Sequence, residues 1–455
     1  MSSTPLAESR PRPGTTFPSA AGRFRRCSEL DVLRLLAALS VVGFHWLFRS
    51  ATGSDPLATT GFEGVAEYFR YGYLGVDVFF VISGFVILRS AWGRSPGVFL
   101  LNRAGRLYPA FWAACTLTAL AVTVLPGDRH AVTFGQWAAN LTMGSEAFGV
   151  TYVDGVYWTL LVELAFYGLV AIGAAFGLTA NRVLAGAGIW LAISVAHHYA
   201  PMSTGWGRLF VPEWAPYFVA GVGFALLATD GPGTDLSRRQ RWAAVVLTVL
   251  SCVWAVRLGV SFAGSLTAKY DVEFSGVVVA SVLLATFAVF VLLVNGVTVP
   301  GAARVAFLGA LTYPLYLVHE NIGYSLLTLG NERLGLNRWV VLVIVAALVV
   351  ALASALHRFV EDPAGRRVSG WTKRLAKRRR QHTRRPSLPD LWRRTWRAVP
   401  TAAPRRTGHT LPAVAPVSPA LPGSAALRPG PEGAAAPEPR ELAAYAGFTA
   451  VSRTL

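Results

Sequence analysis

Residues 30–48 read LDVLRLLAALSVVGFHWLF, and this stretch indicates the kind of fold. A helix needs about 20 mostly apolar residues to cross a bilayer core about 30 Å thick. The stretch has that length, and it carries Arg34 and His45 among aliphatic and aromatic residues. It therefore predicts a transmembrane helix that contains two ionisable side chains.

Nine further apolar runs of similar length follow along the chain. Backbone polar groups are satisfied within lipid only by helices or closed barrels, and these runs are too long and too uniformly apolar for barrel strands. We therefore expect an all-α polytopic membrane protein with about ten transmembrane helices. The nine runs lie at about 72–90, 107–126, 157–177, 182–200, 211–229, 242–260, 275–295, 305–328 and 339–360.

The composition agrees with a membrane protein and argues against a nucleic-acid-binding domain. Hydrophobic residues make up 53% of the chain and charged residues 15%, whereas a soluble domain has roughly 25% charged residues. The net charge is +18, but residues 29–363 contain 19 basic and 19 acidic residues. The positive excess thus lies at the two ends, not along a folded nucleic-acid-binding face. Arginine outnumbers lysine 39 to 3, which is typical of a GC-rich bacterial genome and suggests a bacterial cytoplasmic membrane.

The charge pattern also predicts the orientation and the domain organisation. Arginines gather in alternate loops, and the positive-inside rule then places both termini in the cytoplasm. We expect a polar basic segment at 1–28, a membrane domain at 29–368 and a disordered, basic, Pro/Ala-rich tail at 369–455. The basic part of that tail is expected either to lie on anionic lipid headgroups or to be an inert solvated segment.

Ionisable side chains inside the predicted spans are the candidate functional residues, since each costs at least ~2.5 kcal/mol to insert. Arg34 and His45 are eleven residues apart, which in an α-helix is close to three whole turns and about 16 Å along the axis. They therefore share one helix face. Histidine is the side chain best suited to moving a proton near neutral pH.

Other spans contribute further candidates. Glu163 lies in the fourth predicted span, and Arg103 and Arg106 share a face where the third begins on the cytoplasmic side. Arginines at such a position suit the phosphates of a large anion. Asp77 and His319 also lie in spans, but Asp77 is equally well explained by a packing ion pair and His319 by a buried, hydrogen-bonded histidine.

Several common chemistries have no motif in this chain. It contains neither a phosphate-binding Gly-x-x-x-x-Gly-Lys-Ser/Thr loop nor a Gly-x-Ser-x-Gly nucleophile elbow nor a His-Glu-x-x-His zinc motif. The three cysteines are widely spaced and predict neither a disulfide framework nor a metal site. ATP-driven transport by this chain and serine hydrolysis are therefore disfavoured, and no metal is expected.

Six motifs, in order along the chain, resemble those of the membrane acyltransferase 3 family. They are Leu30–Arg34 with Phe44-His45 (a basic residue, ten others, then histidine), Gly75–Phe85 with its Ser-Gly-Phe element, Arg103–Pro109 with Arg-x-x-Arg, Trp158–Tyr167, Thr312–His319, and Val360–Pro363 with Glu-x-Pro. Any one of them is weak evidence, but six in sequence over about residues 29–368 are specific.

The resemblance implies transfer of an acyl group, commonly acetyl from acetyl-CoA, to a hydroxyl of a carbohydrate, cell-envelope glycan or glycosylated metabolite. It implies that His45 is the general base and that Glu163 orients the histidine or an arginine. Arg34, Arg103 and Arg106 would hold the acyl-CoA, which is a co-substrate, and no bound cofactor is expected. Supporting roles would fall to Asp31, Asp77, Ser83, Tyr316 and His319.

Two other classes of function remain open on the sequence. A transporter or exporter of a small anionic or acylated metabolite also fits ten helices with internal charges, and a membrane scaffold would use the basic tail. The expected partners are membrane lipids, acyl-CoA and a hydroxyl-bearing acceptor, with no nucleic acid. The motif series favours the enzyme, because neither rival needs that constellation.

Overall fold

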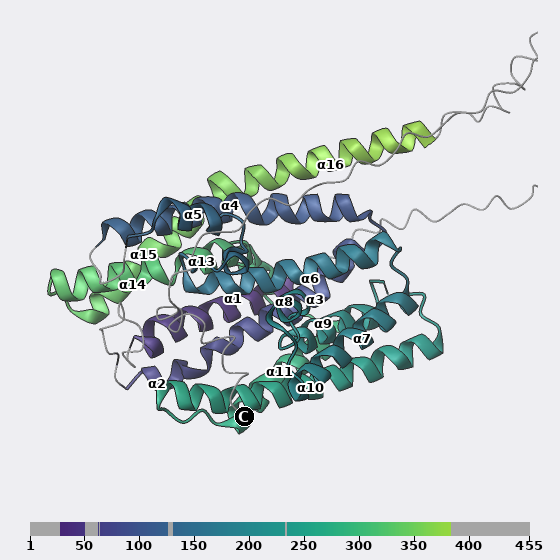
Figure 1. The fold of residues 1–455 in the computed structure, drawn as a ribbon, viewed down its shortest axis with the longest axis horizontal. Coiled ribbons are helices and arrows are strands. Elements are labelled where there is room, and N and C mark those ends of the chain that lie inside the picture. The colour runs from purple at the N-terminus through teal and green to yellow at the C-terminus, as the bar shows by residue number, and fades with distance from the viewer. Residues whose placement is uncertain (1–27, 51–61, 63, 126–130, 233, 384–455) are drawn as a thin grey trace, which may run out of the picture. The chain divides into compact units, whose positions relative to one another are not determined.

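The computed structural model describes residues 28–50, 62, 64–125, 131–232 and 234–383, with side chains as far as residue 375. Within these ranges the chain forms helices and loops and no strand, which confirms the all-α prediction (Figure 1). The chain divides into two units, one that ends at Thr372 and one that begins at Lys373. The first unit contains the membrane domain and is described below.

The first helix of the chain, α1 (Ser28–Gly43), covers most of the first predicted span. In chain order the helices of the first half are α1, η1 (Phe44–Arg49), α2 (Ala66–Phe69), η2 (Arg70–Leu74), α3 (Gly75–Ala91), α4 (Pro96–Val124), α5 (Phe134–Asn140), η3 (Ser145–Phe148), η4 (Gly155–Tyr157), α6 (Trp158–Ala175), α7 (Ala180–Tyr199) and α8 (Thr204–Phe210).

The second half continues the same helical pattern. Its elements are α9 (Ala215–Leu227), α10 (Arg238–Tyr270), α11 (Gly276–Val294), α12 (Ala302–Val305), η5 (Ala306–Ala310), α13 (Thr312–Val318), α14 (Asn321–Thr328), η6 (Leu329–Arg333), α15 (Arg338–Leu356), η7 (His357–Glu361) and α16 (Asp362–Thr383).

Eight helical segments of the described residues are long and apolar enough to cross a membrane, so the chain is a multi-pass membrane protein. The number of ten spans and the cytoplasmic placement of both termini stay predictions. The eight segments are Ser28–Arg49, Ala66–Ala91, Pro96–Val124, Gly155–Ala175, Thr204–Leu227, Arg238–Tyr270, Gly276–Val294 and Arg338–Leu375.

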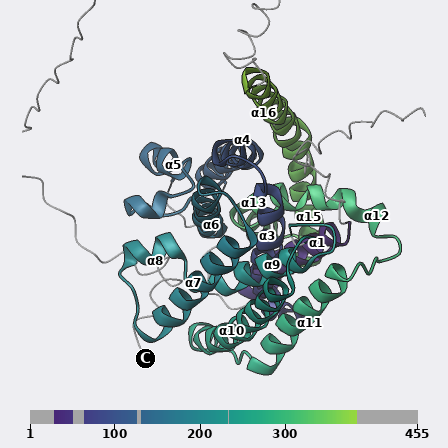
Figure 2. The same cartoon turned by 90° about the vertical axis from the view of Figure 1, so that its right-hand side faces the viewer.

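Helices α3 and α9 form the middle of the bundle, and α10 and α11 lie outside them (Figure 2). Of the apolar stretch in each candidate span, 72% is buried in the span that contains α3 and 78% in the span that contains α9. The corresponding share in α10 is 28%. Gly84 of α3 and Gly221 of α9 face each other's backbones so closely that a Cβ on either would overlap a carbonyl oxygen. Small residues thus allow the close helix contact that drives packing inside a bilayer.

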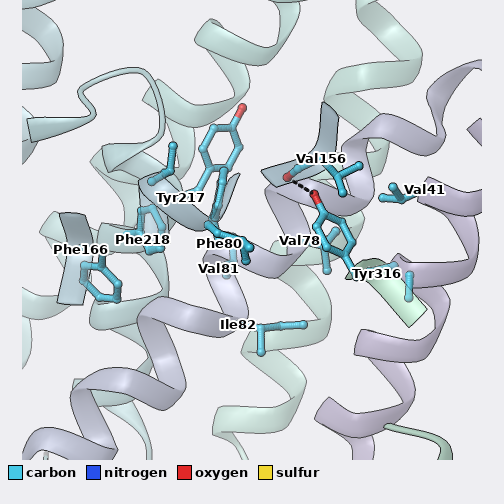
Figure 3. Close-up of a cluster of buried hydrophobic side chains, with 14 of the residues drawn as sticks. Val41, Val78, Phe80, Val81, Ile82, Val156, Phe166, Tyr217, Phe218 and Tyr316 are labelled. Carbon is cyan, nitrogen blue, oxygen red and sulfur yellow. Dashed lines mark hydrogen bonds between the residues drawn. The ribbon is translucent and has the colours of Figure 1, made fainter. Parts of the chain in front are cut away.

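An aromatic cluster fixes α6 against this central pair. The ring of Phe218 in α9 lies 4.8 Å from Phe80 of α3 and 4.4 Å from Phe166 of α6, between ring centroids (Figure 3). On the other side of α3, the hydroxyl of Tyr316 from α13 approaches the carbonyl oxygen of Val156 at 3.5 Å. α3 is therefore flanked by an apolar packing layer and by the polar residues of α6 and α13.

Two irregular segments interrupt the expected helices, and both carry ionisable residues. The first span changes from α-helix to a π-helical turn, η1, at Phe44–Arg49, and such turns are often found at functional sites. The run at 305–328 is not one helix, which corrects our expectation. It breaks at His319 and Glu320 between α13 and α14. The indole N–H of Trp46 donates to the His319 carbonyl at 2.8 Å, so the break leaves that buried oxygen satisfied.

The C-terminal part of the chain begins as a helix. α16 extends to Thr383, so the first residues of the segment expected to be disordered, 369–383, are helical. The dense Lys and Arg residues there are good helix formers, and the helix continues directly from η7. The rest of the predicted tail and the segment at 1–27 lie outside the described residues.

Candidate active site

Five helices enclose a cavity that we call the arginine pocket. Its charged lining residues are Arg34 of α1, Arg103 and Arg106 of α4, and Glu163 of α6. Ser83 of α3 and Tyr316 of α13 also line it. Its apolar wall comes mainly from α3 and includes Val76, Phe79, Phe80, Ile82 and Val86. The pocket thus combines a positively charged part with an apolar part.

Glu163 holds the polar side of the arginine pocket together. Its Oε1 accepts hydrogen bonds from the hydroxyl of Tyr167 at 2.5 Å and from that of Ser83 at 3.1 Å. Arg34 is held from its own helix, because Nη1 donates to Asp31 at 2.9 Å. Glu163 therefore binds to hydroxyl groups of the pocket, and His45 is not among its hydrogen-bond partners in the described residues.

The electrostatics of the arginine pocket favour an anionic ligand. Three arginines line it against one glutamate, which leaves a positive excess. The Nε of Arg103 is buried and has no hydrogen-bond acceptor among the described residues. Arg106 is exposed, which places charge at an accessible edge. A buried donor without an acceptor is costly unless a ligand supplies one, and guanidinium groups match phosphate and carboxylate oxygens.

A second group of polar residues, which we call the histidine cluster, surrounds His45. It consists of His45 and Arg49 from η1, His319 and Glu320 from the break between α13 and α14, and Tyr324 from α14. The Nδ1 of His45 lies 3.2 Å from Glu320 Oε1, from Arg49 Nη1 and from the Tyr324 hydroxyl. Arg49 Nη1 in turn donates to Glu320 Oε1 at 2.7 Å. Three polar side chains therefore surround one imidazole nitrogen.

The contacts of Nδ1 are compatible with a tautomer of His45 in which Nδ1 carries the proton. Tyr324 donates its hydroxyl proton to the His45 carbonyl at 3.1 Å, so its oxygen is left as an acceptor. Arg49 makes its short bond to Glu320, so Glu320 is a carboxylate and a second acceptor. Arg49 Nη1 also lies 3.2 Å from Nδ1, but its shorter bond goes to Glu320, and Nδ1 can donate to the Glu320 carboxylate. In this tautomer the Nε2 of His45 carries the lone pair, which is the form a general base needs.

Aromatic contacts connect the histidine cluster to the arginine pocket, although neither histidine lines the pocket. The rings of His45 and His319 are 5.1 Å apart between centroids, and those of His319 and Tyr316 are 5.5 Å apart. Tyr316 itself lines the pocket. The Nδ1 of His319 lies 2.8 Å from the Tyr316 carbonyl oxygen, which fixes this ring beside Tyr316. One layer of side chains therefore separates the pocket from His45.

The structure brings together most of the residues that the sequence singled out, but in different pairs. Arg34, Arg103, Arg106, Ser83, Glu163 and Tyr316 share the arginine pocket. His45 and His319 share the histidine cluster. Asp77 lies in the first turn of α3, does not line the pocket and makes no hydrogen bond or ion pair within the described residues.

Three polar residues in contact with His45 were not predicted as site residues: Arg49, Glu320 and Tyr324. Glu320 was visible as a carboxylate inside an apolar run, and Arg49 as a basic residue one helical turn after His45. Neither signal identified the partner of His45, because the contact joins segments more than 270 residues apart. Within the described residues, no group of three or more His, Cys, Asp or Glu side chains is arranged to hold a metal ion.

Comparison with known proteins gives a family and distant relatives. A family model described as an acyltransferase domain matches residues 28–358. Nodulation protein 10 of Rhizobium leguminosarum bv. viciae is 30% identical over 162 residues, which cover 31% of this chain and 42% of that protein. The exopolysaccharide production protein ExoZ of Rhizobium meliloti (strain 1021) is 31% identical over 142 residues, covering 30% of this chain and 44% of ExoZ.

A third relative carries an enzymatic name. The putative membrane-bound transacylase BcsY of Komagataeibacter xylinus is 29% identical over 210 residues, covering 40% of this chain and 49% of BcsY. The chain thus spans less than half the length of each of these three relatives. No solved structure matches it significantly.

Proposed function

The chain belongs to the acyltransferase 3 family, and from this premise we propose that it is a bacterial inner-membrane O-acyltransferase. It moves an acyl group, in the first instance acetyl, from acyl-CoA to a hydroxyl of a carbohydrate or glycosylated acceptor. His45 acts as the general base. The arginine pocket binds the donor.

One observation carries the proposal: the arginine pocket is both cationic and apolar. Acyl-CoA has the same two parts, because its phosphates are anionic and its acyl-pantetheine arm has little charge. Arg103 and Arg106 bind the phosphates, and the apolar wall of α3 contacts the arm. The unpartnered Nε of Arg103 gains an acceptor when the donor binds.

The histidine cluster supplies the proton chemistry. The Nε2 of His45 takes the proton of the acceptor hydroxyl while its oxygen attacks the thioester carbonyl carbon. A new C–O bond forms, the C–S bond breaks, and the leaving CoA thiolate receives the proton from His45. Because His45 lies one layer of side chains beyond the arginine pocket, the thioester end must pass Tyr316 to reach it.

The nature of the acceptor is supported by the relatives. ExoZ is named for exopolysaccharide production and BcsY as a putative transacylase. A polysaccharide or its lipid-linked precursor is accordingly the acceptor class that we test first.

The experiment measures release of free CoA from acetyl-CoA by protein purified in detergent, with a pool of sugars and glycosides as acceptors. We expect release that depends on an acceptor. In Arg106→Ala the apparent affinity for acetyl-CoA falls. In Arg94→Ala it does not, because Arg94 is an exposed arginine just before α4 that does not line the pocket.

A transporter gives the opposite pattern. It would move acetyl-CoA or an acylated metabolite across vesicles without releasing CoA. Absence of both CoA release and acetyl-CoA binding in the wild-type protein would contradict the proposed function.

A further inference from the structure

The two carboxylate oxygens of Glu320 meet different surroundings. Oε1 accepts from Arg49 and lies 3.2 Å from Nδ1 of His45. Oε2 is buried and has no hydrogen-bond donor within the described part of the chain. A buried carboxylate oxygen without a donor is unfavourable, so a proton donor is needed beside Oε2.

Asp154 is a second carboxyl group that interacts with Glu320. Its side chain is fully buried, and its oxygens accept backbone N–H groups of Val156 at 3.3 Å and Asn321 at 3.1 Å. The next residue is Gly155, where an added Cβ would lie 2.7 Å from Glu320 Oε2. The absence of a side chain at 155 lets the chain approach this carboxylate.

The charges around the two carboxyl groups decide which one is protonated. Two adjacent carboxyl groups in a buried site do not both ionise. Arg49 is bound to Glu320, whereas Asp154 forms no ion pair with a basic residue in the described ranges. Glu320 therefore keeps the negative charge and Asp154 the proton. In agreement, burial and the neighbouring Glu320 raise the pKa of Asp154 well above its usual value.

We infer that Asp154 and Glu320 share one proton and together position His45. Asp154 donates to Oε2 of Glu320, and Oε1 of Glu320 accepts from Nδ1 of His45, which leaves Nε2 as the basic nitrogen. The role of His45 rests on the proposed function, but the shared proton does not. During acyl transfer this proton stays between the two carboxyl groups, while the proton of the acceptor passes through His45 to CoA.

Other titratable groups also face the pair. They come from five elements or segments around it: His45 and Arg49 of η1, Cys115 of α4, Tyr157 of η4, Tyr316 of α13, and His319. Arg49 is the nearest permanent cation among them. It supports one negative charge on the pair, not two.

The shared proton is measured without any substrate, by infrared spectroscopy of the full chain in lipid nanodiscs at neutral pH. The difference spectrum of wild type minus Asp154→Asn should show loss of a protonated-carboxyl C=O band. The matched control is Asp230→Asn. Both carboxylate oxygens of Asp230 accept from Arg89, so this substitution should leave the protonated-carboxyl region of the spectrum unchanged.

A second variant keeps this test decisive if Asp154→Asn does not fold. In Glu320→Gln the band of Asp154 should remain but change frequency, because its acceptor changes from a carboxylate to an amide. If neither Asp154→Asn nor Glu320→Gln changes a protonated-carboxyl band, the inference is overturned.

The positioning role is measured by the kinetics of CoA release. Glu320→Gln should lower kcat about 10²- to 10⁴-fold with little change in KM for acetyl-CoA, because Glu320 does not line the arginine pocket. The acidic limb of the pH profile of kcat/KM should also move to lower pH, because the negative charge that favours protonated His45 is gone. An equal fall in rate at every pH would show a merely structural role.

The two proposals can fail separately. If the wild-type protein releases no CoA, the proposed function fails, and the infrared band still decides whether the proton is shared. If CoA is released but Glu320→Gln behaves as wild type, the positioning role fails and the enzyme stands.

Discussion

The arginine pocket and the histidine cluster are both polar sites within an apolar bundle, yet they are built in opposite ways. The pocket has more cations than anions, an exposed arginine and a buried N–H without an acceptor. In the cluster the charge of Arg49 is balanced by Glu320, and its other members bond to one another or to the backbone. The pocket therefore has positive charge that its own lining residues do not balance, whereas the charge of Arg49 in the cluster is balanced by Glu320. Within the described residues, Nε2 of His319 and Oε2 of Glu320 nevertheless have no hydrogen-bond partner.

On the proposed function, the two regions separate binding of the donor from proton transfer. Unsatisfied positive charge provides affinity for an external anion. A charge-balanced network of buried groups provides fixed geometry, because Arg49, Glu320 and Tyr324 would each lose an existing hydrogen bond by moving. Substitutions in the two regions should therefore affect different kinetic constants.

Removal of the imidazole should have the largest effect. His45→Ala should lower kcat for CoA release about 10²- to 10⁴-fold, the range that general-base catalysis contributes. Binding of acetyl-CoA should stay within about twofold of wild type by equilibrium titration, because His45 does not line the pocket. A large loss of acetyl-CoA binding in this variant would contradict the claim that the two regions affect different kinetic constants.

Removal of an arginine from the pocket should act on affinity. Arg103→Ala should raise the Kd for acetyl-CoA by about 10- to 100-fold, which corresponds to one or two charge-assisted hydrogen bonds. The rate at saturating acetyl-CoA should change much less. Arg94→Ala serves as the matched control, and an equal loss of affinity there would show that only the general positive charge matters.

A substitution at Gly155 tests whether the position of Glu320 matters, because it displaces the Glu320 side chain without removing it. Gly155→Ala places a methyl group 2.7 Å from Oε2 of a carboxylate that Arg49 holds in place, so kcat should fall about tenfold. Gly168→Ala in α6 is the control, because an added Cβ there meets no atom within 4 Å. Equal rates in the two variants would mean that the position of Glu320 is not critical.

The smallest expected effect is that of salt. Raising the ionic strength from about 0.1 M to about 1 M shortens the Debye length from about 10 Å to about 3 Å. The Kd for acetyl-CoA should rise several-fold, because Arg106 is exposed to solvent. The infrared band of the buried carboxyl pair should not change. A salt-insensitive Kd would contradict phosphate binding at this edge.

The sequence predicted the helical class and the ionisable residues well, because both depend on local information. An apolar run of about 20 residues has few alternatives to a helix, and a charge within it stands out. Arg34, His45 and Glu163 were identified in this way, and Arg103 and Arg106 by their position where a span begins. Each of the five lies in one of the two polar regions.

The pairing of these residues could not be predicted, because it depends on which helices are neighbours. Glu163 was expected to orient His45 or an arginine, and the structure gives it hydroxyl partners from α3 and α6. Glu320 was hidden by the assumption of one continuous helix at 305–328, and the break at His319 brings its carboxylate to His45. Asp154 precedes a span, so the sequence carries no sign of its burial.

The most direct test of the separation is the rate of CoA release as a function of acetyl-CoA concentration, recorded side by side for wild type, Arg103→Ala and His45→Ala. A high acetyl-CoA concentration should restore the rate of Arg103→Ala and leave His45→Ala slow at every concentration. Recovery of His45→Ala at high acetyl-CoA, with Arg103→Ala slow throughout, would contradict the separation.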